Sequence, residues 1–180
     1  MRYDIGLITK FVLEYDAGIP KSIILGLSVF LCGVVVICLL KADNPKLIRN
    51  VGWSMFFIYL CLILCLTVIC RESKEVTQLT LKPIWRYESL NYKLIAESIL
   101  NFLLFIPLGF STGAGIRDRN IMKALGMGFG LSLAIEMIQL LSKRGVCNID
   151  DLILNTLGCV IGYWLFLLCL MMITAVRKND

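Results

Sequence analysis

The chain has 180 residues, of which 58% are hydrophobic, with a formal net charge of +5 and a mean hydropathy of +0.82. Soluble domains are about 45–50% apolar, so this composition excludes an ordinary soluble fold and predicts an all-α, polytopic membrane helix bundle. Lys and Arg are scattered through the connecting segments instead of forming one patch, which excludes a nucleic-acid partner.

Five apolar segments are long enough to cross the roughly 30 Å hydrocarbon core of a bilayer as helices. They are residues 22–40, 51–70, 95–115, 121–142 and 152–176. The leading segment repeats apolar residues at helical spacing, which favours an interfacial helix, with a loosely ordered tail as the alternative. The predicted organisation is an N-terminal segment (1–21), two plain spans (22–70), an outer loop (71–94) and a three-helix core (95–176).

The distribution of cations predicts the orientation of the chain. Lys and Arg are retained on the cytoplasmic side of short connecting segments. The segments densest in cations hold Lys41, Lys46 and Arg49, then Arg117, Arg119 and Lys123, and finally Arg177 and Lys178. We therefore expect the N-terminus outside and the C-terminus in the cytoplasm.

The chain has no histidine and eight cysteines. Without imidazole, any acid–base chemistry must use carboxylates, amides, lysine or arginine. Seven cysteines fall in or at the ends of the apolar runs, where they act as small hydrophobes: Cys32, Cys38, Cys61, Cys65, Cys70, Cys159 and Cys169. Cys147 lies in a loop, and a contact with Cys70 is a weakly supported alternative. No spacing indicates zinc, and no cofactor is expected.

Glu136 lies inside the apolar run 121–141. An ionisable group at membrane depth costs about 2.5–3.5 kcal/mol, so such a residue is a candidate functional residue by default. Other polar residues lie near the same ends of the last three spans, within about 10 Å of the outer face at 1.5 Å rise per residue. The predicted binding residues are Glu97, Asn101, Glu136, Gln139, Arg144, Asp150, Asp151 and Asn155. Glu136 and Asp151 are the candidates for catalysis.

Small residues recur at four-residue spacing in the same three spans, which permits close approach of membrane helices. Together with a proline that frees a backbone carbonyl of the third span, they predict a tight bundle around the polar residues. These predicted packing residues are Pro107, Gly109, Gly113, Gly126, Gly130, Gly158 and Gly162.

Three strings in this order resemble the VanZ-like membrane protein family. They are NFLLFIPLG at 101–109, SLAIEMIQ at 132–139, and Arg144 followed by DDLILNTLG at 150–158, with LKPIW at 81–85 as a lead-in. The resemblance covers residues 79–170. It implies a protein of the bacterial cell membrane, in a family whose namesake confers low-level teicoplanin resistance without vancomycin resistance.

Structural roles are the alternative for each polar residue. Asn148, Asp150 and Asp151 have the chemistry of a helix start. Asn155 could donate a hydrogen bond to Glu136 or Gln139, and Glu136 could pair with Arg144.

Three functions compete. The first is binding or modifying an anionic envelope component: a lipid headgroup, a phosphate-bearing or lipid-linked wall precursor, or a glycopeptide. A divalent cation held by the acids is a variant without supporting spacing. The second is an assembly factor or scaffold whose polar residues only lock helix packing. The third, a proton-coupled transporter, is disfavoured because the polar residues gather at one face.

Overall fold

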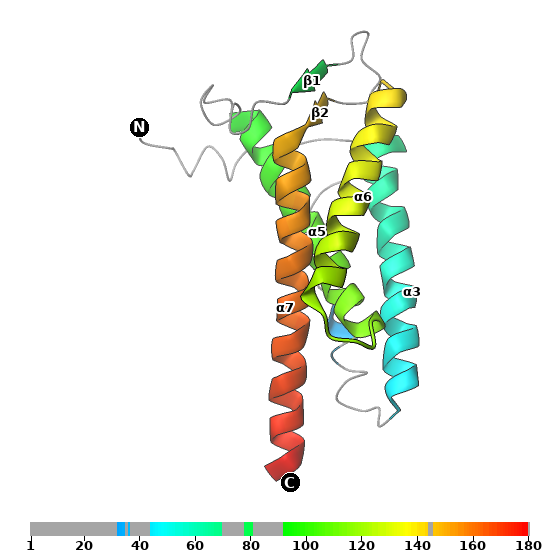
Figure 1. Cartoon of the computed structure of the whole chain (residues 1–180), viewed down its shortest axis with the longest axis vertical. Helices are drawn as coiled ribbons and strands as arrows, with labels where there is room; N and C mark the ends of the chain where they lie inside the picture. The colour runs from blue at the N-terminus through cyan, green and yellow to red at the C-terminus, as the bar shows by residue number, and fades with distance from the viewer. Residues whose placement is uncertain are drawn as a thin grey trace, which may run out of the picture.

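The computed structural model describes residues 32–34, 36, 44–69, 78–80, 92–143 and 146–179. These residues form a bundle of long helices with a pair of short strands at one end (Figure 1). In chain order the elements are α3 (Pro45–Leu64), the π-helix η1 (Cys65–Ile69), β1 (Gln78–Thr80), α5 (Tyr92–Gly115), α6 (Ile121–Leu141), β2 (Val146–Asn148) and α7 (Ile149–Asn179).

Within the described residues, four helices are long and apolar enough to cross a membrane: Pro45–Ile69, Ser98–Gly115, Ile121–Leu141 and Ile149–Lys178. They correspond to the second to fifth predicted spans, and the prediction of an all-α membrane bundle is confirmed. Most of the predicted first span and all of the predicted interfacial helix lie outside the described residues.

Helix α3 begins at Pro45, six residues before the predicted start of its span. The Asn44 side chain accepts a hydrogen bond from the backbone N–H of Lys46 at 2.9 Å, and proline is favoured in the first turn of a helix. Lys46 and Arg49 therefore stand on the helix and not in a loop. Helix α7 likewise extends beyond the predicted 152–176, starting at Ile149 and ending at Asn179.

Strands β1 and β2 are a correction to the predicted loops. They pair in parallel, with Gln78 opposite Val146 and Thr80 opposite Asn148. Each strand has three residues, too few for an alternating pattern to be visible in the sequence. The pair ties the predicted outer loop to the start of α7, directly beside the polar ends of the helices (Figure 1).

Helices α5 and α7 form the most extensive contact of the bundle; α3 packs on α5, and α6 packs on α7. The α5–α7 contact depends on glycine. A Cβ atom added at Gly109 would lie 1.9 Å from the carbonyl oxygen of Cys159, and one added at Gly162 would lie 1.9 Å from that of Ile106. The two backbones therefore approach more closely than any larger residue permits.

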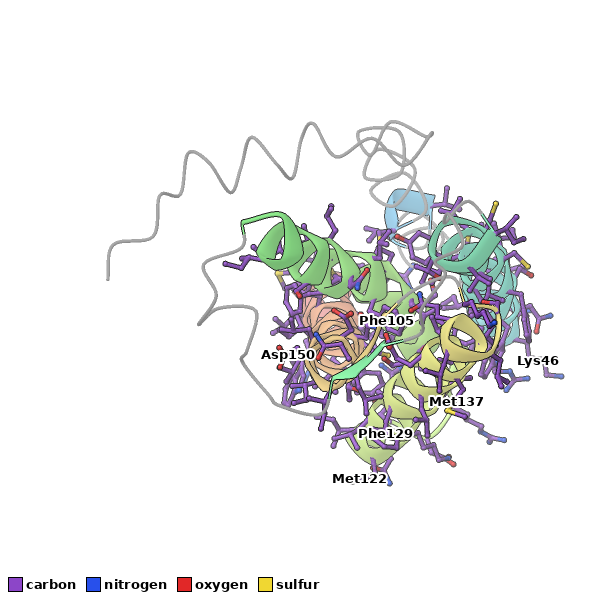
Figure 2. All side chains as sticks on the ribbon, turned by 90° about the horizontal axis from the view of Figure 1, so that it is seen from above. Lys46, Phe105, Met122, Phe129, Met137 and Asp150 are labelled. Atoms are coloured by element: carbon purple, nitrogen blue, oxygen red, sulfur yellow. The ribbon has the colours of Figure 1, made fainter. Side chains whose placement is uncertain are left out.

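Helix α6 turns an apolar face outwards. Met122, Phe129 and Met137 are exposed on it, whereas Phe105 of α5 is buried between the helices (Figure 2). Exposed apolar side chains along a candidate span fit contact with lipid tails.

Gly126 and Gly130 are on the exposed part of α6, and a Cβ added at either would meet nothing within 4 Å. The prediction that this pair packs against a neighbouring helix is wrong for the described residues. Gly128 makes the contact instead, because a Cβ there would lie 2.7 Å from Cβ of Cys159 on α7. The buried face of α6 is the one that carries Ser132 and Glu136.

This difference predicts opposite results for two glycine-to-alanine substitutions. Gly162→Ala should destabilise the protein by about 1–3 kcal/mol, because the added methyl group overlaps a backbone carbonyl that cannot move freely. Gly126→Ala, the matched control, should be neutral or stabilise by about 0.5–1 kcal/mol, because alanine is the better helix former. Thermal unfolding of both variants in detergent checks this, and equal stabilities would contradict the proposed packing.

Candidate functional site

Eight buried polar side chains gather where α6 ends and α7 begins. We call this group the polar cluster. It consists of Ser98 of α5, Ser132, Glu136 and Gln139 of α6, Asn148 of β2, and Asp150, Asp151 and Asn155 of α7. Each is at most 5% exposed, so the group is removed from solvent. Five of the eight predicted binding residues belong to it.

Glu136 is held by the backbone at the start of α7. The N–H of Asn148 donates a hydrogen bond of 2.9 Å to Glu136 Oε2. A carboxylate beside a helix N-terminus is stabilised by the free N–H groups and the positive end of the helix dipole. The sequence predicts Glu136 near the polar start of the last span but does not reveal this backbone donor.

Asn148 caps α7. Its Oδ1 accepts the N–H of Asp150 at 3.1 Å, while Asp150 and Asp151 fill the first turn. The alternative reading of helix-start chemistry thus holds for Asn148. Asn148 is also a cluster residue that the predicted set lacks, although an Asn followed by acids and an apolar run is a signal for a cap.

Two further bonds join α7 to its neighbours. Asn155 Nδ2 donates to Ser132 Oγ on α6 at 2.9 Å, and Ser98 Oγ on α5 donates to Asp151 Oδ1 at a longer 3.4 Å. The sequence predicts Glu136 or Gln139 as the partner of Asn155. In the structure, Asn155 donates this bond to Ser132 instead. Serine is easily missed in a sequence because it is common on both faces of membrane helices.

Gln139 reaches a helix outside the predicted three-helix core. Its Nε2 donates a 2.9 Å hydrogen bond to the backbone carbonyl of Thr67 in η1. A π-helical turn changes the hydrogen-bond register of the backbone, and such turns are frequent at functional sites. The second span thus takes part in the site through its backbone, although its sequence carries no formal charge.

Several buried atoms of the cluster have no hydrogen-bond partner among the described residues. Among them are the acceptors Gln139 Oε1 and Asn155 Oδ1 and the donor Asn148 Nδ2. Each of these side chains is fixed by its other polar atom, so the open atom has a defined position. A buried polar atom without a partner costs about 1–3 kcal/mol, so these atoms are candidates for contact with a ligand.

The remaining predicted residues are less well placed. Asn101 is half-buried on α5, and Glu97 lies on α5 with a side chain outside the described part. Arg144 lies outside the described residues, so its predicted pairing with Glu136 stays a prediction. Lys143, exposed beside it, has a backbone φ of 55°, in the left-handed region that lysine seldom adopts.

A metal centre gains no support from this geometry. Among the residues that the structure describes, no three Asp, Glu or Cys side chains converge as ligands. The divalent-cation variant remains a prediction.

The comparisons with known proteins bear on this arrangement. The model of the VanZ/LLP1 family matches residues 56–171, which is more than half of the chain. The chain belongs to the VanZ/LLP1 family. With its candidate spans, this membership identifies a multi-pass protein of the bacterial membrane. The match begins within α3, so the family region is longer than the resemblance over 79–170.

A curated relative is Protein VanZ of Enterococcus faecium, which is 31% identical over 70 residues. The aligned part is 39% of this chain and 44% of that protein, so the chain spans less than half the length of this relative. No solved structure matches the chain.

The cap predicts a graded effect at Asn148. Asn148→Ala should lower the free energy of unfolding by about 0.5–2 kcal/mol, because the N–H of Asp150 loses its acceptor. Asn148→Ser should retain most of that stability, since serine is an equally good cap. Both variants keep the backbone N–H that Glu136 accepts. Thermal unfolding in detergent measures the difference, and identical midpoints for the two variants would exclude the cap.

Proposed function

We propose that the polar cluster binds the headgroup of a cell-envelope component at the outer face of the membrane. The observation that carries this is the set of open, fixed atoms on Gln139, Asn148 and Asn155. Two acceptors and one donor, held among carboxylates, suit the hydroxyl and amide groups of sugars and peptides. Lipid-linked wall precursors and glycopeptides carry both kinds of group.

The anionic part of such a ligand fits the edge of the polar cluster, next to Lys143, better than the interior of the cluster. Within the cluster, the described charged side chains are all acids, which repel phosphate: Glu136, Asp150 and Asp151. Lys143 is exposed at the end of α6, and Arg144 follows it in the chain. The proposal therefore places phosphate or carboxylate groups at this edge and neutral groups inside.

The orientation supports an outer-face site. Cations gather at the opposite end of the bundle, where Lys46, Arg49, Arg117 and Arg119 line one cavity. The positive-inside rule favours the cytoplasmic side for that end, and the outer side for the polar cluster. Lipid-linked wall precursors are used at the outer face of the membrane, and glycopeptides reach the cell from that side. Binding of a lipoglycopeptide or its target would give low-level teicoplanin resistance, the role implied by the family resemblance.

Two other functions fit the geometry less well. A scaffold would use its polar atoms to join helices, but Gln139, Asn148 and Asn155 each keep one buried polar atom without a partner among the described residues. A proton-coupled carrier needs polar groups through the whole bundle. Below the cluster, the described core is apolar, with Phe105, Leu108, Phe110 and Phe166 buried. Ser111 and Thr112 there donate to carbonyls of their own helix.

Glu136→Gln tests the functional role of the cluster. Glutamine keeps an acceptor for the N–H of Asn148 but removes the negative charge, so folding should be retained and protection against teicoplanin lost. Asp118→Asn is the matched control, since it removes one acid at the other end of the bundle. Susceptibility to teicoplanin and vancomycin is measured in a sensitive host together with the amount of folded protein.

A folded and fully protective Glu136→Gln variant would overturn the proposal. The scaffold function would then be the remaining hypothesis. If wild type gives no protection in that host, the role in resistance is wrong, and the following lipid measurement carries the binding claim alone.

Asn155→Leu tests ligand binding directly. Leucine is similar in size but removes both the bond to Ser132 and the open acceptor, so a bound envelope lipid should be lost. Mass spectrometry of lipids that co-purify with wild type and variant measures this, with Ser132→Ala as the control that removes only the internal bond. Equal lipid content in all three would contradict binding at the cluster. A chemically altered lipid in cells expressing wild type would assign a reaction, with Glu136 and Asp151 as its acid–base candidates.

A further inference from the structure

A second polar feature lies at the end of the bundle opposite the polar cluster. Here the first turns of α3, the α5–α6 loop and the middle of α7 enclose a cavity of about 360 Å³. We call it the basic cavity. Its lining is Pro45, Lys46, Ile48, Arg49, Ala114, Ile116, Arg117, Arg119, Phe166 and Leu170.

The basic cavity is strongly cationic. Four of its lining residues carry a positive charge, and among the described residues none of the lining is acidic. The N-terminus of α3 adds the positive end of its helix dipole. The first turn of α3 has no acidic residue to offset that charge. Like charges brought together in this way are unfavourable without an anion.

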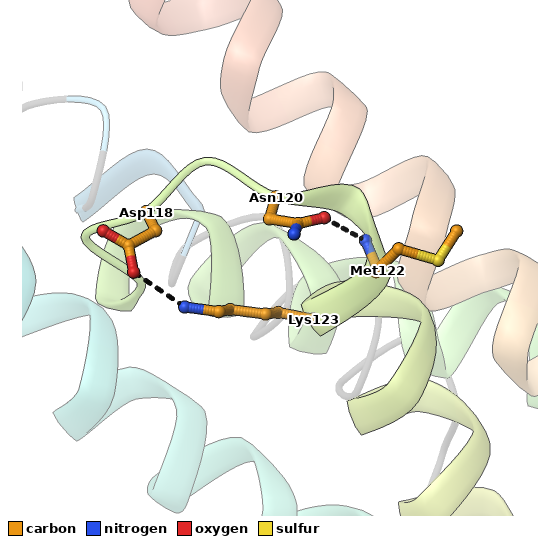
Figure 3. Close-up of polar contacts among 4 residues, drawn as sticks. All are labelled: Asp118, Asn120, Met122 and Lys123. Carbon is orange, nitrogen blue, oxygen red and sulfur yellow. Dashed lines mark hydrogen bonds and ion pairs between the residues drawn. The ribbon is translucent and has the colours of Figure 1, made fainter.

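Asp118, the acidic residue of the α5–α6 loop, already forms an ion pair. Lys123 Nζ donates a 2.8 Å hydrogen bond to Asp118 Oδ2 (Figure 3). This bond and the charge of Lys123 lower the pKa of the Asp118 carboxyl, so it stays ionised and compensates Lys123. Asn120 caps α6 by accepting the N–H of Met122 at 2.9 Å. These contacts order the loop. The Asp118 carboxyl also attracts Arg117, while Arg117 and Arg119 both line the cavity.

The walls of the basic cavity are divided by chemistry. Opposite the cations lie apolar side chains, among them Ile48, Phe166 and Leu170. The Arg119 guanidinium lies 5.8 Å from the centre of the Phe166 ring, which holds it at the boundary between the two parts. A ligand that fills this space has an anionic head and a hydrocarbon tail.

The depth of the cavity fits a lipid. Helices α3 and α7 continue past the α5–α6 loop at this end (Figure 1). From Phe166 to the end of α7 the helix rises by roughly 20 Å, at 1.5 Å per residue. The cavity therefore lies within the length of the bundle and not beyond its end, so a bound acyl chain could lie along the helices.

We propose that the basic cavity binds the phosphate group of an anionic phospholipid, with its acyl chain against Ile48, Phe166 and Leu170. This site is separate from the polar cluster and does not depend on the proposed function. Guanidinium groups suit it, because they bind phosphate oxygens in pairs.

Native mass spectrometry of the full-length protein in detergent tests this with phosphatidylglycerol and phosphatidylcholine of identical acyl chains. Phosphatidylglycerol should bind more tightly, and the double variant Arg49→Gln/Arg117→Gln should weaken it about tenfold or more. The double variant Arg177→Gln/Lys178→Gln removes equal charge at the same end outside the cavity, and it should bind like wild type.

If both double variants bound phosphatidylglycerol equally weakly, the proposed site would be wrong. General electrostatic attraction to this end of the bundle would then explain the binding. Equal affinity for the two lipids would also overturn the proposed site. Inorganic phosphate at millimolar concentration should not displace the lipid; full displacement would assign the cavity to a free anion. If Arg49→Gln/Arg117→Gln does not fold, Arg117→Gln alone carries the test, since Arg117 is exposed in the loop and packs against no helix core.

Discussion

The hydrogen bond from the Asn148 N–H to Glu136 is the interaction on which the junction of α6 and α7 depends. A carboxylate in an apolar helix needs strong donors, because burying its charge without hydrogen bonds is costly. The backbone at the start of α7 supplies one such donor. This fixes where α7 starts relative to α6, and so where Asp151 and Asn155 lie. The β1–β2 pair holds the same junction from outside.

Close glycine packing and buried polarity reinforce each other in this fold. The contacts of Gly109 and Gly162 bring α5 and α7 together, and that approach places Ser98 beside Asp151. The two ends of the bundle then differ in charge. The end with the polar cluster offers acids and amides, whereas the other end holds a basic cavity. Under the two proposals, these unlike ends would contact different components in the two leaflets.

Much of this could be predicted from the sequence. Hydropathy and span length predict the helices, and the depth of Glu136, Asp151 and Asn155 places them at one end. The partners could not be predicted, because the donor to Glu136 is a backbone N–H and the acceptor of Gln139 is a carbonyl in a π-helix. Helical phase was the other failure. Four-residue spacing fits Gly126 and Gly130 as well as Gly128, and only tertiary packing selects the buried face.

The central claim is that Glu136 anchors the start of α7, and amide hydrogen exchange tests it most directly. Exchange at the Asn148 amide is measured in lipid nanodiscs for wild type, Glu136→Gln and Glu136→Ala. The account predicts slow exchange in wild type and Glu136→Gln, and exchange at least about tenfold faster in Glu136→Ala, whose acceptor is gone. Equally fast exchange in all three, or equally slow exchange in all three, would contradict it.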